Sequence, residues 1–356
     1  MKKIEKELFK NLCSFKKEKL DERLLEGATP NILGHLFFNR MQAIAYGVLE
    51  KNNLLSNVNR EIRNSLKSAF EQNKKQNESF FRCVRYISGL LEKCDCKYAV
   101  LKGAYLCGYY PIGYRTSNDI DLLVAPNDVT EIGNILLSAG FRQGNIRGGK
   151  FVPATRREII ESKMLRGETV PYIKEINLPQ MRFLEVDINF SLDYKNGNEE
   201  VINEMLDSVT ERTLNGIRIK TFSQENFFIH LCNHLYKEAT TMPWVEMMRD
   251  MTLYKYCDIY LLLNDLPQID TLKIFKQAKK LEMEKICAFA VLHASELFEL
   301  NNTYAVALAK EILKDDPDFI HTVILPKDKR EFVYIKKNVF DRLFVTDRKK
   351  ILKEKR

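Results

Sequence analysis

The sequence lacks a long apolar run. None of its 356 residues belongs to a stretch approaching the roughly 20 consecutive apolar positions that a membrane-spanning helix needs. Its first ten residues, Met1 to Lys10, are charged and lack the apolar core and small-residue cleavage site of a secretory signal. We therefore predict a cytoplasmic protein without a membrane partner.

Paired cysteine motifs are also missing. The eight cysteines are scattered along the chain, with no C-x-x-C spacing. Only Cys94 and Cys96 lie close together, and one intervening residue is a poor fit to zinc ligation or to a dithiol motif. We expect reduced, structural thiols.

Apolar residues make up 45% of the chain and charged residues 29%, values typical of a globular protein. The net charge of +8 is concentrated at the C-terminus, where residues 327–356 hold twelve Lys and Arg against five Asp and Glu. This basic tail is suited to a phosphate-rich partner such as RNA, which it would bind with release of counterions. The alternative is a solvated helix of mixed charge.

Apolar spacing divides the chain into three predicted segments. Helical periodicity runs through residues 1–92 and returns in residues 223–356, while short strands and helices alternate in residues 93–222. The fold class expected is α+β, with a small mixed-sheet core between an N-terminal helical region and a C-terminal helical domain that ends in the basic tail. Residues 142–180 are basic and weakly periodic, which indicates an insertion, and the polar residues 71–78 indicate an exposed helical section or a linker.

The most informative segment is residues 101–124, LKGAYLCGYYPIGYRTSNDIDLLV. Successive residues of a strand alternate between its two faces, so Asp119 and Asp121 project to one side and Ile120 to the other. Two carboxylates held so close repel each other unless a cation lies between them. The pair therefore predicts a Mg²⁺ platform, although an isolated Asp-x-Asp also occurs at solvated strand ends and turns.

A third carboxylate is expected on the strand of residues 182–192, where apolar residues alternate with Glu185, Asp187 and Asn189. Magnesium, or manganese in its place, takes oxygen ligands, and a second ion would need another carboxylate that could also orient an attacking hydroxyl. Asp187 is the best candidate, and Glu185, on the same face, is the alternative. The chemistry implied is attack on the α-phosphate of a nucleoside triphosphate (NTP), with pyrophosphate leaving.

The phosphates are expected near Lys102 and Gly103, at a turn from strand to helix. Free backbone N–H groups and the positive end of a helix dipole favour a phosphate there. Gly103 lets the backbone approach closely, Lys102 or Arg115 is suited to binding the triphosphate, and Ser117 offers a hydroxyl donor. The competing interpretation makes Lys102 and Arg115 salt-bridge partners that brace the strand.

These motifs resemble the DNA polymerase beta-like nucleotidyltransferase superfamily, in which a strand, a glycine turn and a short helix precede an Asp-x-Asp strand. More narrowly, Leu-Lys-Gly, an Arg four residues before Asp-Ile-Asp-Leu-Leu-Val and the later Glu-Val-Asp-Ile resemble the uncharacterised bacterial nucleotidyltransferase family. The resemblance implies metal-dependent transfer of a nucleoside monophosphate, with Asp119, Asp121 and Asp187 as catalytic metal ligands and ATP as one candidate donor.

The sequence departs from the resemblance at two places. The turn has Ala104 after Gly103 where the superfamily has Ser or Gly, which removes a hydroxyl from the phosphate side. The strand after Asp187 continues with Asn189 and Phe190 where the narrower family favours His and Trp. Three acceptor classes stay open: RNA, a protein side chain and a small molecule. The alternative function is a catalytically silent nucleotide-binding or assembly module of the same fold.

Overall fold

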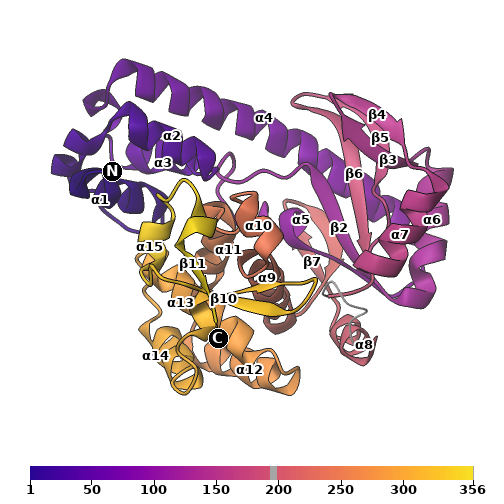
Figure 1. Ribbon diagram of the computed structural model, residues 1–356. Coiled ribbons are helices and arrows are strands. Elements are labelled where there is room, and N and C mark those ends of the chain that lie inside the picture. Colours follow the sequence, from indigo (N-terminus) through magenta and orange to yellow (C-terminus); the bar gives the residue numbers. More distant parts are fainter. Residues whose placement is uncertain (193–198, 356) are drawn as a thin grey trace. The chain divides into compact units, whose positions relative to one another are not determined.

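The computed structural model describes residues 1–192 and 199–355 of the chain. They form two compact units, one of residues 71–227 and one that joins residues 1–70 to residues 228–356. Two helices carry the chain from one unit to the other, α4 (Arg60–Leu91) and α9 (Gln224–Ala239) (Figure 1). The three consecutive segments expected from the sequence stay a prediction, because compactness does not establish which segments fold on their own.

The unit of residues 71–227 is built on a six-stranded mixed sheet in the order β1-β2-β6-β5-β3-β4 (Figure 1). Its strands are β1 (Tyr98–Val100), β2 (Asp119–Val124), β3 (Arg142–Arg147), β4 (Lys150–Pro153), β5 (Tyr172–Leu178) and β6 (Met181–Asn189). Its helices include α5 (Lys102–Leu106), α6 (Val129–Ser138), α7 (Arg156–Arg166) and α8 (Glu199–Asp207), with a short 3-10 turn at Pro126–Asp128. A separate hairpin pairs β7 (Thr210–Leu214) with β8 (Ile217–Thr221). Helices beside a mixed sheet confirm the predicted α+β class.

The predicted insertion at residues 142–180 contains β3, β4, α7 and β5, and three of these elements widen the sheet. Gly148 and Gly149 both have positive φ in the turn from β3 to β4, a conformation that glycine adopts at little cost. Helix α7 begins in a reciprocal capping box of Thr155 and Glu158 and ends at Gly167 in the left-handed region. Local turn and cap signals therefore define this segment better than its weak periodicity.

Two polar residues of this unit, Asp128 and Asn77, have structural roles, and Asn77 corrects the expectation for residues 71–78. Asp128 stands at the N-cap position of α6 but does not cap it with its side chain, and its Oδ2 instead accepts a hydrogen bond of 2.7 Å from Lys97 N. The polar residues 71–78 are helical, as one alternative held, but they are not simply exposed, since Asn77 is 1% exposed within α4. Both polar side chains bind neighbouring loops.

The unit that joins residues 1–70 to residues 228–356 is mainly helical, as predicted for its sequence. Its other helices are α1 (Lys3–Cys13), α2 (Pro30–Phe38), α3 (Gln42–Lys51), α10 (Met242–Glu246), α11 (Leu253–Asn264), α12 (Gln268–Lys280), α13 (Glu284–Leu297), α14 (Thr303–Ile312) and α15 (Val339–Arg342). Short 3-10 turns lie at Glu22–Gly27, Leu55–Asn57, Phe319–His321 and Arg348–Ile351. Thr29 caps α2, whose first residue is Pro30, and buried apolar residues of α11 and α13 fill the core.

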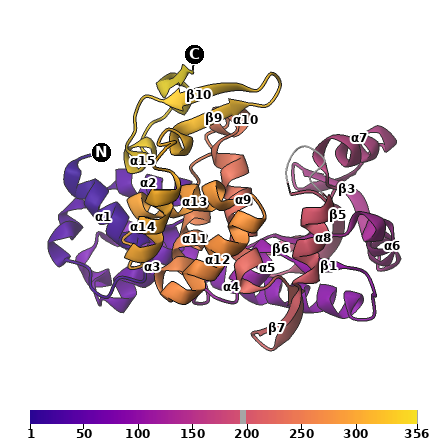
Figure 2. The same cartoon turned by 90° about the horizontal axis from the view of Figure 1, so that it is seen from below.

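The basic tail is not a solvated helix, and that interpretation is wrong. Residues 322–354 form a three-stranded antiparallel sheet of β9 (Thr322–Leu325), β10 (Arg330–Tyr334) and β11 (Leu352–Glu354). Helix α10 lies against this sheet (Figure 2), with Met242 and Val245 packed on Val323 and Tyr334. Only the last residue of the tail, Arg356, lies outside the described residues.

Two arginines of the tail are buried. Arg348 donates to both carboxylate oxygens of Asp250, at 2.6 to 2.9 Å, and Tyr334 donates to the same carboxylate. Arg342 donates to the carbonyl oxygens of Lys336 and Lys337. Part of the tail's positive charge is therefore structural.

The described chain contains no helix that is both long enough and apolar enough to cross a membrane. All eight cysteines are buried, and the described residues contain no disulfide.

Candidate active site

The predicted carboxylates meet on two adjacent parallel strands. In the register of β2 and β6, Asp121 lies beside Asp187 and Asp119 lies beside Glu185. Paired residues of adjacent strands point to the same face of a sheet, and so do residues two apart on one strand. Four carboxylates consequently share one face, while Ile120, Val186 and Ile188 are buried on the other.

Crowding and burial disfavour ionisation of these carboxylates. The pKa of Asp187 is raised well above its usual value, first by burial and then by Asp121, Glu185 and Asp119. Burial also raises the pKa of Asp121, and this effect outweighs the lowering by Lys102. Burial, together with repulsion from Asp119 and Asp121, raises the pKa of Glu185. A positive charge close to this face would therefore favour the ionised carboxylates.

Lys102 supplies one positive charge. Its Nζ lies 2.7 Å from Asp121 Oδ1, in an ion pair whose side chains are 20% and 8% exposed. Burial lowers the pKa of Lys102, but the attraction of Asp121, Asp119 and Asp187 outweighs it and the net direction is upward. Lys102 also has a φ of +42°, which is uncommon for a residue with a side chain and stores backbone strain at this position.

Gly103 is required by a close contact inside the protein. A Cβ at this position would lie 2.6 Å from Ser117 Cβ, closer than side-chain carbons approach each other. Ser117 in turn donates a hydrogen bond of 2.8 Å from Oγ to Asp119 Oδ1. Since α5 has only five residues, its dipole is small, and the predicted phosphate contact depends on Lys102 and local N–H groups.

The loop that carries Arg115 and Ser117 is held by α4. Asn77 donates from Nδ2 to Arg115 O at 2.7 Å, and its Oδ1 accepts from Gly113 N at 2.7 Å. Asn73 and Gln76 donate to the carbonyl oxygens of Gly113 and Ser117. These positioning residues were not predicted from the sequence, although three amides at helical spacing in a polar stretch were a signal.

Arg115 lies close enough to Asp121 to lower the pKa of that carboxyl. Its Nη1 donates to Thr116 O at 3.3 Å. Asn189, at one departure from the family pattern, donates from Nδ2 to Leu122 O at 3.5 Å, a contact between β6 and β2. The next residue, Phe190, donates its backbone N–H to Gly167 O. These contacts hold the end of β6 in place at the departure formed by Asn189 and Phe190.

The donor set fits a hard divalent cation. Carboxylate oxygens suit Mg²⁺ and Mn²⁺ and are poor ligands for soft metals. Burial first, and then repulsion from neighbouring carboxylates, raise the pKa values of Asp121 and Asp187, and a cation would relieve that repulsion. Among the described residues, the oxygens of the three Asp do not form a group within 4.8 Å of one another, and Asp121 is engaged by Lys102. Binding a cation would thus require these side chains to reorient.

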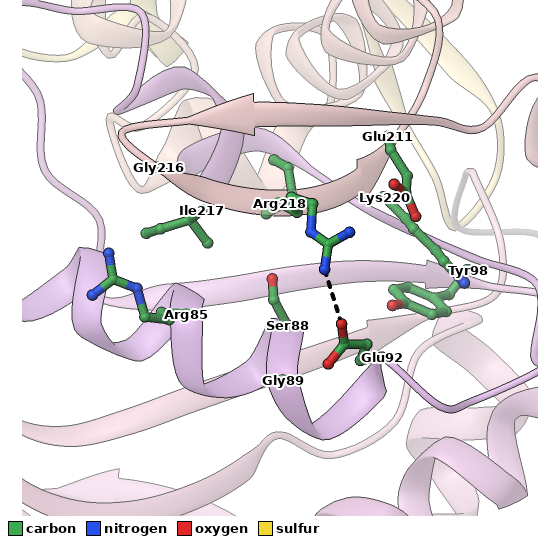
Figure 3. A pocket seen from close by; sticks show the side chains of 11 residues that line it. Arg85, Ser88, Gly89, Glu92, Tyr98, Glu211, Gly216, Ile217, Arg218 and Lys220 are labelled. Carbon is green, nitrogen blue, oxygen red and sulfur yellow. Dashed lines mark hydrogen bonds and ion pairs between the residues drawn. The ribbon is translucent and has the colours of Figure 1, made fainter.

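A pocket of about 260 Å³ lies elsewhere on the same unit, between α4 and the hairpin β7-β8 (Figure 3). Its charged lining consists of Arg85, Glu92, Glu211, Arg218 and Lys220, and Arg218 Nη2 lies 3.1 Å from Glu92 Oε1. None of the predicted site residues lines this pocket. Its mixed charges carry no concentration of carboxylates, so it is not the predicted metal site.

A family model described as uncharacterised nucleotidyltransferase matches residues 31–299, well over half of the chain. The chain belongs to this family. The match includes every predicted site residue from Lys102 to Asp187 and ends before the basic tail begins at Lys327. Membership in this family supports a nucleotidyl transfer function for this chain.

Two solved structures resemble this nucleotidyltransferase. An antigenic nucleotidyltransferase-like protein from Paracoccidioides brasiliensis is 14% identical, with a TM-score of 0.33 over 59% of this chain and 92% of that chain. The antibiotic-resistance factor ANT(2'')-Ia is 12% identical, with a TM-score of 0.32 over 58% of this chain and 96% of that chain. No curated protein matches the sequence.

Proposed function

We propose that this nucleotidyltransferase moves a nucleoside monophosphate from an NTP to an acceptor hydroxyl, with Mg²⁺ or Mn²⁺ held by Asp119, Asp121 and Asp187. The observation that supports this proposal most strongly is the parallel pairing of β2 with β6, which gathers four carboxylates on one face. A structural ion pair needs one carboxylate for one lysine. The carboxylates beyond the one that pairs with Lys102 are the ligands that a catalytic cation would need.

Asp187 is assigned the acceptor side of the reaction. It lies beside Asp121 across the pairing of β2 with β6, so it is placed next to the cation, where a carboxylate can orient or deprotonate an attacking hydroxyl. A divalent cation bound here would neutralise charge on the α-phosphate and favour the ionised form of the attacking hydroxyl. Asp119, fixed by the Ser117 hydroxyl, and Asp121 are assigned to holding that cation.

The donor side is assigned to Lys102, Gly103, Arg115 and Ser117. The lysine that neutralises Asp121 in the free protein is placed to turn to the triphosphate once a cation binds the carboxylate. Arg115, on the loop that Asn77 holds, adds positive charge to the same region. Both residues act by positioning and charge neutralisation, which is most of what phosphoryl-type transfer requires.

The finer classification is part of the same proposal. The glycine turn followed by Asp-x-Asp supports placement in the DNA polymerase beta-like superfamily, ATP is a candidate donor, and the expected location is the cytoplasm. RNA, a protein side chain and a small molecule remain the candidate acceptors. RNA is suggested by the tail, where Lys327, Lys329 and Lys353 are exposed.

Calorimetry of ATP and GTP binding, with Mg²⁺ and then with EDTA, tests the metal and the nucleotide together. We expect at least one nucleotide to bind in Mg²⁺ and to lose most of its affinity in EDTA. The Asp121→Asn variant should show the same loss without EDTA. Equal affinity in EDTA would overturn the metal assignment.

The acceptor is found by incubating the protein with each α-labelled NTP, a divalent cation and a cell extract, and then separating RNA, protein and small molecules. The labelled fraction identifies the acceptor class. The Asp187→Asn protein, which we expect to keep the fold, is the matched control. Binding of a nucleotide with no labelled product in any fraction would favour the silent module over the enzyme.

A further inference from the structure

A second group of ligand-bearing side chains lies away from the carboxylate face. The Sγ atoms of Cys94 and Cys96 and a carboxylate oxygen of Glu131 all lie within 4.8 Å of one another. The cysteines belong to the loop between α4 and β1, and Glu131 belongs to the first turn of α6. Three residues from two separate elements of the unit thus converge on one point.

The loop that carries the two cysteines is fixed in place. Cys96 N donates to Cys94 Sγ at 3.4 Å, which sets the two thiols side by side. Lys97 N donates to Asp128 Oδ2 at 2.7 Å, which ties the loop to the start of α6. Cys94 and Cys96 are 6% and 7% exposed, whereas Glu131 is exposed, so the group is closed on the thiol side and open to solvent on the carboxylate side.

We propose that Cys94, Cys96 and Glu131 bind a thiophilic divalent cation of the Zn²⁺ class. Two thiolates and one carboxylate are ligands that zinc accepts, and three protein ligands leave its fourth position to water. The single residue between the cysteines is a poor fit to zinc when the motif is considered alone. Glu131 removes that objection, because it supplies the third ligand from a different element.

The charges around the group favour a cation. Burial, the neighbouring Cys94 thiol and the carboxylates Asp128 and Glu131 all raise the pKa of Cys96. The carboxylates of Asp128 and Glu131 place negative charge beside the thiols, which attracts a metal ion, and the ion would replace the thiol protons when it binds. The soft sulfur ligands also distinguish this group from the all-oxygen carboxylate face.

A bound cation would connect two parts of the unit that lead to the candidate active site. Strand β1 begins at Tyr98, directly after this loop, and is followed by Leu101 and Lys102. Linking the loop to α6 would hold the start of β1 against the unit. The expected role is therefore structural, and the proposal stands whether or not the carboxylate face transfers nucleotides.

The test is metal binding by the full-length chain, purified in a reductant that does not chelate metals. One equivalent of Zn²⁺ should bind, and Co²⁺ in its place should give the near-ultraviolet absorption of a sulfur-to-cobalt charge transfer. Cys94→Ser and Cys96→Ser should each lower the affinity by more than the roughly 10- to 100-fold that losing an outer-shell partner costs. Glu131→Gln, at an exposed position, should weaken binding without any effect on folding.

Cys83→Ser is the matched control, because it removes a buried thiol of the same unit that is not in the group. It should bind Zn²⁺ like the unmodified protein. Absence of stoichiometric Zn²⁺ binding would overturn the proposal, and so would binding that survives in both Cys94→Ser and Cys96→Ser. If a cysteine variant folds poorly, the Zn²⁺ affinity of the Glu131→Gln protein and the cobalt spectrum of the unmodified chain decide the question. A cobalt spectrum without the sulfur-to-cobalt charge-transfer absorption would also contradict the site.

Discussion

Replacing Asp187 by Asn should lower nucleotide transfer strongly and at the same time stabilise the metal-free protein. Asp187 and Asp121 are register partners on adjacent strands, which places their Cα atoms about 4.8 Å apart. Two unit charges at that distance repel each other by about 3 kcal/mol at an effective dielectric constant of about 20. Proton uptake and Lys102 relieve most of this repulsion, so about 1 kcal/mol should be recovered in the variant.

The pH dependence of this gain has a defined sign. Because the pKa of Asp187 is raised in the folded protein, the folded state holds its proton more tightly than the unfolded state does. The free energy of unfolding therefore falls as pH rises from the ordinary Asp pKa through the raised one. Asp187→Asn does not titrate, so its advantage over the unmodified protein should be absent at low pH and largest above that window.

Thermal unfolding in EDTA measures the gain, and about 1 kcal/mol corresponds to a rise of about 2–4 °C for a unit of this size. Nucleotide transfer, measured with Mg²⁺, should fall on the order of a hundredfold or more, the size of positioned acid-base effects. Added Mg²⁺ should raise the melting temperature of the unmodified protein more than that of the variant. A variant that melts lower than the unmodified protein in EDTA would refute the electrostatic reasoning.

Glu185→Gln is the control for the same argument. Glu185 lies on the same strand and face, and its pKa is also raised by burial and by the Asp pair. It should therefore share part of the stabilisation while keeping most of the activity. If Glu185→Gln loses activity and Asp187→Asn does not, Glu185 is the third carboxylate.

Three further predictions concern positioning, the tail and the buried charges. Asn77→Ala should cost about 1–3 kcal/mol, because it removes the hydrogen bonds that Asn77 makes with Arg115 O and Gly113 N. It should also raise KM for the NTP. Urea unfolding measures the first effect and steady-state kinetics the second, and an unchanged KM would remove Asn77 from the site. If RNA is the acceptor, replacing exposed tail lysines by Gln should flatten the salt dependence of RNA binding and leave NTP binding intact. The slope should change by about 0.9 for each phosphate that is no longer neutralised. An unchanged slope would exclude the tail as the RNA-binding segment, and the matched control is the same change on α12. Arg348→Met should lower the free energy of unfolding in urea by about 3–5 kcal/mol, because it leaves Asp250 buried without the Arg348 guanidinium. Adding Asp250→Asn to the same chain should restore part of that loss. An Arg348→Met protein of unchanged stability would contradict the structural role of this ion pair. The lysines to replace are Lys327, Lys329 and Lys353, and the control set is Lys276, Lys279 and Lys280.

Alternation along the sequence predicted which carboxylates share a face but not which of them become neighbours. Both strands form where they were expected, at Asp119–Val124 and Met181–Asn189, although the second ends at Asn189 and not at residue 192. The alternation extends over most of the second strand but only over the first residues of the first. Register is a property of two strands together, and no pattern within either strand states that Asp121 lies beside Asp187. The ion pair of Lys102 with Asp121 depends on the same register.

The elements missed have little apolar content to give a periodic signal. Strand β10 is mostly charged or half-buried, and its neighbours in the sheet are short, so turn and edge contacts define it more than periodicity does. Asn77 looked like part of a solvated helical section because a polar residue buried by loop contacts has the same sequence signature as an exposed one. The glycine pair at Gly148 and Gly149 was a usable turn signal.

The most direct test of nucleotidyl transfer compares the two ends of the triphosphate. The protein is incubated with Mg²⁺ and its acceptor fraction, once with an NTP labelled at the α-phosphate and once with the same NTP labelled at the γ-phosphate. We expect the α-label to become attached to the acceptor while the γ-label is released as pyrophosphate, and we expect Asp187→Asn to do neither. Transfer of the γ-label to the acceptor, or its release as free phosphate with no α-label transferred, would contradict nucleotidyl transfer.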